Sequence, residues 1–185
     1  VSYSYYSNLG RATQSEWNLL FQDDKSVFIG GGNIEYIGNN TSIGPNDRSF
    51  QLKVSGQFTP HIINDFSKDS VFSQGLVFRD PYYVKDYILN PDWKIYPDSK
   101  VISGFDCKKA TTNFRGRTYE VWFSPDIPVN FGPWKLNGLP GLILMATDDK
   151  NQIEFLATKI KLNEDIDIDS KIAALPKLGE EVSLK

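Results

Sequence analysis

The stretch that decides the fold reads Gly138-Leu139-Pro140-Gly141-Leu142-Ile143. Proline fixes φ at about −65° and glycine accepts positive φ, so Leu139 to Leu142 fits a type II turn. The apolar run from Leu142 to Ala146 follows at once and predicts a buried strand. We therefore expect a tight corner, pinned into the core by its leucine and isoleucine side chains, that leads into a central strand.

Extended segments surround this corner. The segments Val101 to Phe114 and Arg117 to Phe123 alternate in polarity and flank a short glycine turn, which predicts a hairpin. After Leu142 to Ala146, the polar run Asp148 to Asn151 turns the chain and Ile153 to Thr158 returns. The second half of the chain therefore predicts antiparallel strands joined by short turns.

The first half carries a weaker version of the same pattern. Trp17 to Phe21 and Ser26 to Ile29 predict a hairpin, and Phe50 to Val54 alternates as a half-buried strand does. The stretch from Ser55 to Asp69 is ambiguous, and a short helix over Ile62 to Phe66 is one of its interpretations. We expect a mainly β fold with little helix, built as a curved, largely antiparallel sheet of half-barrel or sandwich-like form.

The length of 185 residues suits one domain with one core, spanning residues 1–185. A loop excursion is expected at about residues 30–48, where Gly, Asn, Ser and Pro gather, and a peripheral tail at residues 163–185. The aromatic fraction of 14% favours pleated, half-buried surfaces.

Composition also limits the classes of partner that the chain can have. The net charge of −3 offers no basic face, so no nucleic acid is expected. No apolar run reaches the roughly 20 residues of a transmembrane helix. The first residues carry no signal peptide, and we expect any such peptide to have been removed.

Four blocks in order resemble a known family. They are Ile102 to Ala110, Arg115 to Phe123, Ile127-Pro128, and Gly132 to Ile143, which contains the motif Gly-Leu-Pro-Gly-Leu-Ile. This order is similar to the GLPGLI family of Bacteroidetes-type bacteria, also called the Porph_ging family. The resemblance implies a periplasmic or cell-surface location and association with TonB-dependent outer-membrane receptors. It supplies no activity, no catalytic residue and no cofactor, and we interpret the motif as structural.

The residue types of nucleophilic and zinc sites are scarce. Cys107 is the sole cysteine and His61 the sole histidine, whereas zinc sites take three or four His, Cys or carboxylate ligands. We expect Cys107 to be a small buried side chain and His61 a solvated loop residue. No catalytic residue, metal site or cofactor is therefore predicted.

Two acidic sets have alternative interpretations. Asp165, Asp167 and Asp169 would share one face of a strand and could hold a hard cation, but a solvated acidic edge is favoured. Carboxylates such as Asp126, Asp148 or Asp149 could perform acid–base work if two of them converged in a cleft.

A set of basic and aromatic residues near the motif is a candidate binding surface, because Arg and Trp are favoured at interfaces. The alternative, slightly favoured, is that these are outward-facing hairpin residues. The set is Arg115, Arg117, Trp122, Trp134 and Lys135. Separately, Asp69-Ser70-Val71 resembles an O-glycosylation acceptor, with Ser70 as the modified residue.

These observations favour a non-catalytic extracytoplasmic protein of the cell envelope that works beside an outer-membrane TonB-dependent transporter. One alternative is a periplasmic carrier of an apolar ligand in a half-barrel cavity. Another is a hydrolase that uses a pair of carboxylates.

Overall fold

The structure is a computed structural model that describes residues 1–31, 35–36, 59–77 and 80–183. Most of the expected excursion at residues 30–48 and the whole predicted strand from Phe50 to Val54 lie outside the described residues. Those two expectations therefore stay predictions.

The described residues form thirteen strands, one 3-10 helix (Phe66–Lys68) and one α-helix, α1 (Ile168–Ala173). The strands are β1 (Ser2–Asn8), β2 (Ala12–Gln22), β3 (Lys25–Gly30), β4 (Glu35–Tyr36), β5 (His61–Asp65), β6 (Ser70–Val77), β7 (Asp80–Tyr87), β8 (Lys94–Ile102), β9 (Phe105–Phe114), β10 (Arg117–Ser124), β11 (Leu142–Asp148), β12 (Ile153–Lys159) and β13 (Glu180–Ser183).

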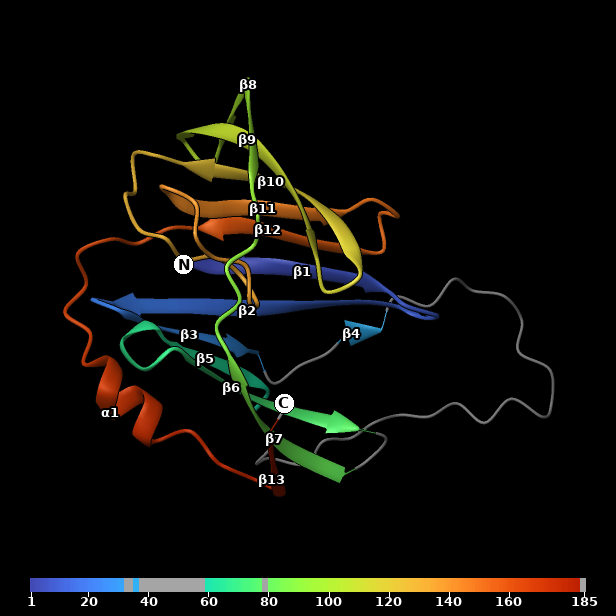
Figure 1. Cartoon of the computed structure of the whole chain (residues 1–185), viewed down its shortest axis with the longest axis vertical. Coiled ribbons are helices and arrows are strands. Elements are labelled where there is room, and N and C mark those ends of the chain that lie inside the picture. The colour runs from blue at the N-terminus through green and yellow to red at the C-terminus, as the bar shows by residue number, and fades with distance from the viewer. Residues whose placement is uncertain (32–34, 37–58, 78–79, 184–185) are drawn as a thin grey trace.

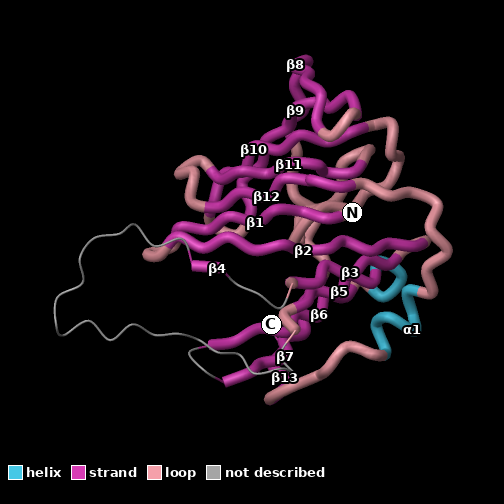
Figure 2. The backbone as a smooth tube through the Cα atoms, turned by 180° about the vertical axis from the view of Figure 1, so that it is seen from behind, coloured by secondary structure: helices cyan, strands magenta, loops and turns pink. Residues whose placement is uncertain are grey.

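All these strands belong to one open sheet (Figure 1). Its order is β13-β7-β6-β5-β3-β2-β1-β12-β11-β10-β9-β8, and β4 lies beside β2. Every pairing is antiparallel except that of β13 with β7. The predicted fold class, a curved and largely antiparallel sheet with little helix, is confirmed. Seen from behind, the helical part is confined to one side, near β2 and β3 (Figure 2).

The predicted hairpins are present as β2–β3, β9–β10 and β11–β12. One boundary was wrong, because Val101 to Phe114 is two strands rather than one. Ser103 and Gly104 both have positive φ, as Arg115 and Gly116 do at the next turn. Two consecutive positive φ values are typical of a two-residue hairpin turn. The alternation of β8 is also broken by Pro97, where its register shifts at the sheet edge.

The corner at residues 138–143 is a tighter turn than expected. The amide of Gly141 donates to the carbonyl oxygen of Leu139 at 2.8 Å, and the amide of Leu142 donates to Ile127 at 3.0 Å. A type II turn would have closed between Leu139 and Leu142, so the type II prediction was wrong and the turn is a three-residue one. Leu139, Leu142 and Ile143 are at most 1% exposed.

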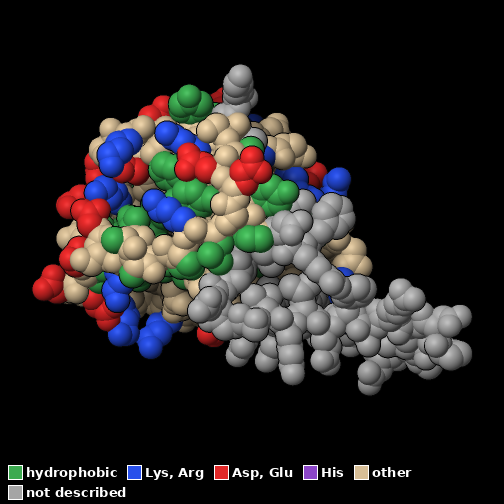
Figure 3. All heavy atoms as spheres, turned by 90° about the horizontal axis from the view of Figure 1, so that it is seen from below, with side chains coloured by type: hydrophobic (Ala, Val, Ile, Leu, Met, Phe, Trp, Pro, Cys, Tyr) green, Lys and Arg blue, Asp and Glu red, His purple; other side chains and the backbone are tan. Residues whose placement is uncertain are grey.

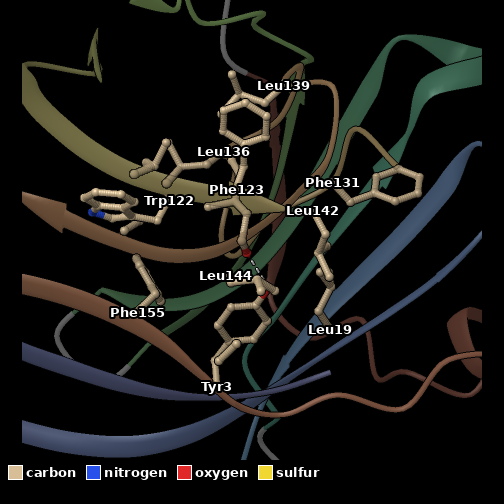
Figure 4. Close-up of a cluster of buried hydrophobic side chains, with 14 of the residues drawn as sticks. Tyr3, Leu19, Trp122, Phe123, Phe131, Leu136, Leu139, Leu142, Leu144 and Phe155 are labelled. Atoms are coloured by element: carbon tan, nitrogen blue, oxygen red, sulfur yellow. Dashed lines mark hydrogen bonds between the residues drawn. The ribbon is translucent and has the colours of Figure 1, made fainter. Parts of the chain in front are cut away.

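The core lies where the long segment between β10 and β11 folds back over the inner face of the sheet. Phe131, Leu136 and Leu139 from this segment meet Tyr3 and Leu19 from β1 and β2 in one buried cluster (Figure 4). Phe131 also contacts the ring of Phe21 at 5.5 Å between centroids. This segment therefore fills one part of the inner face and leaves the rest of it open.

Two of the alternative interpretations were wrong, one for residues near β5 and one for residues near α1. Ile62 to Phe66 is not a helix, because its residues belong to β5, whose five residues are all buried, and to the start of the 3-10 helix. The acidic residues Asp165, Asp167 and Asp169 do not share a strand face. Asp167 caps α1 by accepting from the amide of Ser170 at 3.0 Å, and Asp169 pairs with Lys25 at 2.6 Å. The alternating acidic pattern does not form a strand here, because Asp167 serves as the N-cap of a helix instead.

Candidate functional site

A cleft of about 630 Å³ opens on the inner face of the sheet. Its lining comes from β1, β2, β3 and β12 in the middle of the strand order, and also from β5 to β7 and β10, which lie towards opposite ends. The sheet must therefore curl around the cleft. Viewed from below, hydrophobic side chains gather at the middle of the molecule among charged ones (Figure 3). A cleft of this size and character is typical of ligand sites.

The floor of the cleft is aromatic. Tyr5 stacks on Phe155 and Trp17 stacks on Phe28, each pair at 4.8 Å between ring centroids and 19° between planes. Tyr5 and Trp17 meet edge to face at 6.1 Å. These rings share one face because Tyr5 and Phe155 are paired across β1 and β12. Gly30 makes room for the indole, since a Cβ there would lie 3.0 Å from the ring of Trp17.

One wall is built around Trp134. Its ring contacts Phe114 at 5.7 Å and Tyr119 at 6.1 Å between centroids. The backbone of Trp134 has a φ of +58°, a value that bulky residues rarely adopt. Strained backbone of this kind costs about 1 to 3 kcal/mol and clusters at functional sites.

The opposite wall comes from β5, β6 and β7. Ile62, Tyr82 and Val84 give it an apolar surface, and Ser73 and Gly75 lie between them. The Ser73 hydroxyl is buried and has no hydrogen-bond partner among the described residues. Buried polar groups are nearly always hydrogen-bonded, so an unpaired hydroxyl beside the cleft is unusual.

Charged groups gather beside the Trp134 wall. The Asp86 carboxylate on β7 accepts from the Arg115 guanidinium and lies 3.4 Å from the Lys135 ammonium. Burial opposes ionisation of Asp86, but the hydrogen bonds from Arg115 and from the Tyr87 amide and the charge of Lys135 outweigh it, so the pKa of Asp86 is lowered. Burial, and then the charge of Arg115, lowers the pKa of Lys135.

The five predicted binding-surface residues do not form one surface. Trp134 and Lys135 line the cleft, and Arg115 reaches them through Asp86. Trp122 lies on the other face of β10, where the Lys100 ammonium sits 4.2 Å from its ring centroid. Arg117 pairs with Asp148 and Gln152 instead.

Cys107 is 1% exposed, and burial raises the pKa of its thiol to about 11. His61 is also buried, so the solvated loop expected there was wrong. It opens β5, and its Nδ1–H donates to the backbone carbonyl oxygen of Thr59 over 2.8 Å. Burial lowers its pKa. The signal for burial was the apolar pair that follows it, which continues a central strand.

The three carboxylates named for a hydrolase do not converge. Asp126 follows the end of β10 at Ser124, whereas Asp148 pairs with Tyr119 near its start. Asp148 is 2% exposed and accepts from the amides of Gln152 and Ile153 at 2.6 and 2.9 Å, so it closes a turn. Asp149 is exposed. Among the described residues, no group of three or more His, Cys, Asp or Glu is arranged to hold a metal ion.

Ser70 is 7% exposed and begins β6, opposite Asp65 and Tyr87. The folded strand leaves little room for an attached glycan there, and the modification stays a prediction. Across the described residues, no helix has the length and apolar character needed to span a membrane.

Sequence reasoning missed most of the cleft. Tyr5, Trp17, Tyr119 and Phe155 were assigned to strands or left unmarked, although each has an apolar residue two positions away in its strand. Such spacing marks one face of a strand, but which faces come together depends on the strand order.

Comparison with known proteins gives a consistent answer. A family model described as N-glycanase peptide, N-terminal domain, matches residues 83–179, which is just over half of the chain. A search of curated proteins found no match. A structure of PNGF-II in space group P21 matches with a TM-score of 0.57 and 19% identity, covering 99% of this chain and 31% of that one. A structure of PNGF-II in space group C2 matches with a TM-score of 0.56 and 17% identity, covering 100% of this chain and 31% of that one.

These matches correct the earlier expectations. The structures show a shared fold, and this chain spans about a third of their length. The matching model is not that of the GLPGLI family, so the resemblance drawn from the blocks around residues 138–143 was wrong. The predicted role beside a TonB-dependent transporter was therefore also wrong. The two alternatives, an apolar-ligand carrier and a carboxylate hydrolase, match the N-glycanase family no better. By its match over residues 83–179, the chain belongs to the N-glycanase peptide, N-terminal domain family.

Proposed function

We propose that this chain works as the N-terminal domain of an N-glycanase and that its aromatic cleft holds part of the glycoprotein substrate. The family match carries the proposal, because residues 83–179 include the wall residues Tyr119, Trp134 and Lys135 and the floor residue Phe155. The release of N-linked glycans would then be carried out by the enzyme that contains the domain. An extracytoplasmic location, where glycoproteins are met, is part of this proposal.

The chemistry of the cleft supports a glycan as its occupant. A sugar ring has faces of C–H groups and a rim of hydroxyls. The face of an aromatic ring carries partial negative charge and attracts such hydrogens, and Tyr and Trp combine an apolar body with a polar tip. The floor formed by Tyr5 and Trp17 and the wall formed by Trp134 provide these surfaces.

The test is direct binding of a glycan. The chain is titrated with ribonuclease B, which bears a high-mannose N-glycan, and with its unglycosylated form, ribonuclease A. Binding is followed by calorimetry and by tryptophan fluorescence, to which Trp17 and Trp134 contribute from inside the cleft. We expect binding of the glycosylated form alone, weakened at least tenfold by Trp134→Ala, or about 1.4 kcal/mol.

A matched control is Tyr87→Ala, which removes an aromatic ring that is 63% exposed and does not line the cleft. This variant should bind as the unchanged chain does. Equal binding of the two ribonucleases, or no binding of either, would sink the proposal.

A further inference from the structure

Among the described residues, positive charge exceeds negative charge at the Trp134 wall. Two cations, Arg115 and Lys135, share the one carboxylate of Asp86. The neighbouring pair of Arg117 with Asp148 is balanced, one cation to one carboxylate. The wall therefore carries a net positive charge, which a bound anion would neutralise.

Asp86 is already satisfied without Lys135. Its carboxylate accepts from the Arg115 guanidinium and from the Tyr87 amide at 2.9 Å. The Lys135 ammonium is 3.4 Å away, longer than the about 2.7 to 2.9 Å of a strong charge-assisted hydrogen bond. Lys135 has three donors and this one long contact in the described residues.

Lys135 is nevertheless buried, with 10% of its side chain exposed, and it lines the cleft. A buried ammonium with a distant counter-charge is costly, and its lowered pKa reflects that cost. A carboxylate placed beside it would offset the loss of hydration.

The backbone explains how Trp134 and Lys135 serve one ligand. Neighbouring residues of an extended strand point to opposite sides, so they would not normally line the same cleft. Trp134 has a φ of +58°, and both residues line it. An aromatic face and an ammonium are thus presented side by side, a pairing that matches a sugar ring bearing a carboxylate.

We propose that the cleft takes an acidic sugar, whose ring packs on Trp134 and Tyr119 and whose carboxylate pairs with Lys135. This inference rests on the proposed glycan-binding function and names its ligand class. Neutral sugars would bind through the aromatic surfaces alone. Acidic sugars would gain the ionic contact in addition.

The experiment compares sialyllactose with its methyl ester, in which a methyl group caps the carboxylate and removes its charge. The chain is titrated with each by calorimetry at low and high salt. We expect the acid to bind at least tenfold more tightly than the ester, with the difference reduced in high salt. Lys135→Met should abolish the difference, and Lys135→Arg should retain part of it.

Lys100→Met is the matched control, because Lys100 packs on Trp122 on the opposite face of the sheet. It should leave the preference for the acid unchanged. Circular dichroism checks the fold of each variant, and if Lys135→Met does not fold, Lys135→Gln replaces it.

The possible failures are distinguishable. Equal binding of acid and ester overturns the acidic-sugar inference but leaves the proposed glycan function standing. Binding of ribonuclease B without binding of sialyllactose has the same two consequences. An acid preference that survives loss of the Lys135 charge also overturns the inference. No binding of any glycan overturns both proposals.

Discussion

The phenol hydroxyl of Tyr3 donates a hydrogen bond of 2.6 Å to the backbone carbonyl oxygen of Ile143. The two residues are 140 positions apart, and both are at most 1% exposed. The bond ties the first strand of the chain to the start of β11, inside the cluster drawn in Figure 4. Burial raises the pKa of Tyr3, so its hydroxyl keeps its proton and can act as the donor.

Tyr3→Phe should destabilise the fold by about 1 to 3 kcal/mol, because it leaves the Ile143 carbonyl buried with one partner fewer while the ring still packs. The measurement is the urea midpoint. Tyr87→Phe removes the same hydroxyl from an exposed ring and should change stability by less than about 0.5 kcal/mol. Equal effects of the two changes would show that the buried bond contributes nothing.

Gly141→Ala should prevent stable folding. A Cβ at this position would lie 2.2 Å from the carbonyl oxygen of Ser124, which is backbone and cannot rotate away. Gly75→Ala is the control, since no atom of the described residues lies within 4 Å of a Cβ there. Soluble yield and thermal unfolding are measured for both. A Gly141→Ala chain that unfolds at the same temperature as Gly75→Ala would contradict the crowding at this corner.

Hairpins were predictable from the sequence because their signals are local. The turn at Arg115-Gly116 and the apolar run of β11 can be recognised within a few residues. The burial of residues 139, 142 and 143 follows from the same short stretch. The exact turn type does not, because it depends on the hydrogen bond from Leu142 to Ile127, which another segment supplies.

The cleft could not be predicted in the same way. It requires Tyr5 of β1, Tyr82 of β7 and Trp134 of a loop to face one space, and strand order decides that. Sequence alone placed Trp134 with Trp122, which lies on the opposite face of the sheet. The conclusion about family was also wrong, because four short blocks within residues 102–143 are weaker evidence than a family model matched over residues 83–179.

Asp86 should make the fold sensitive to acid. Its pKa is lowered in the folded state, so its contribution to stability is present above its unfolded pKa of about 4 and is lost as pH falls through the lower folded value. Asp86→Asn should be less stable near pH 7 and should lose less stability between about pH 5 and pH 2. Asp149→Asn, an exposed change, is the control. Parallel acid profiles for Asp86→Asn and the unchanged chain would contradict this role.

Cys107 should resist alkylation while the chain is folded. Burial raises the pKa of its thiol to about 11, so only about one thiol in a thousand is ionised at pH 8, and the thiolate is the reactive form. Iodoacetamide labelling, followed by mass spectrometry, should therefore be slow in buffer and fast in urea, where an ordinary pKa of about 8.5 returns. Cys107→Ala controls for labelling elsewhere. Because a raised thiol pKa protects only the folded state, equal rates with and without urea would place Cys107 at the surface and contradict its burial on β9.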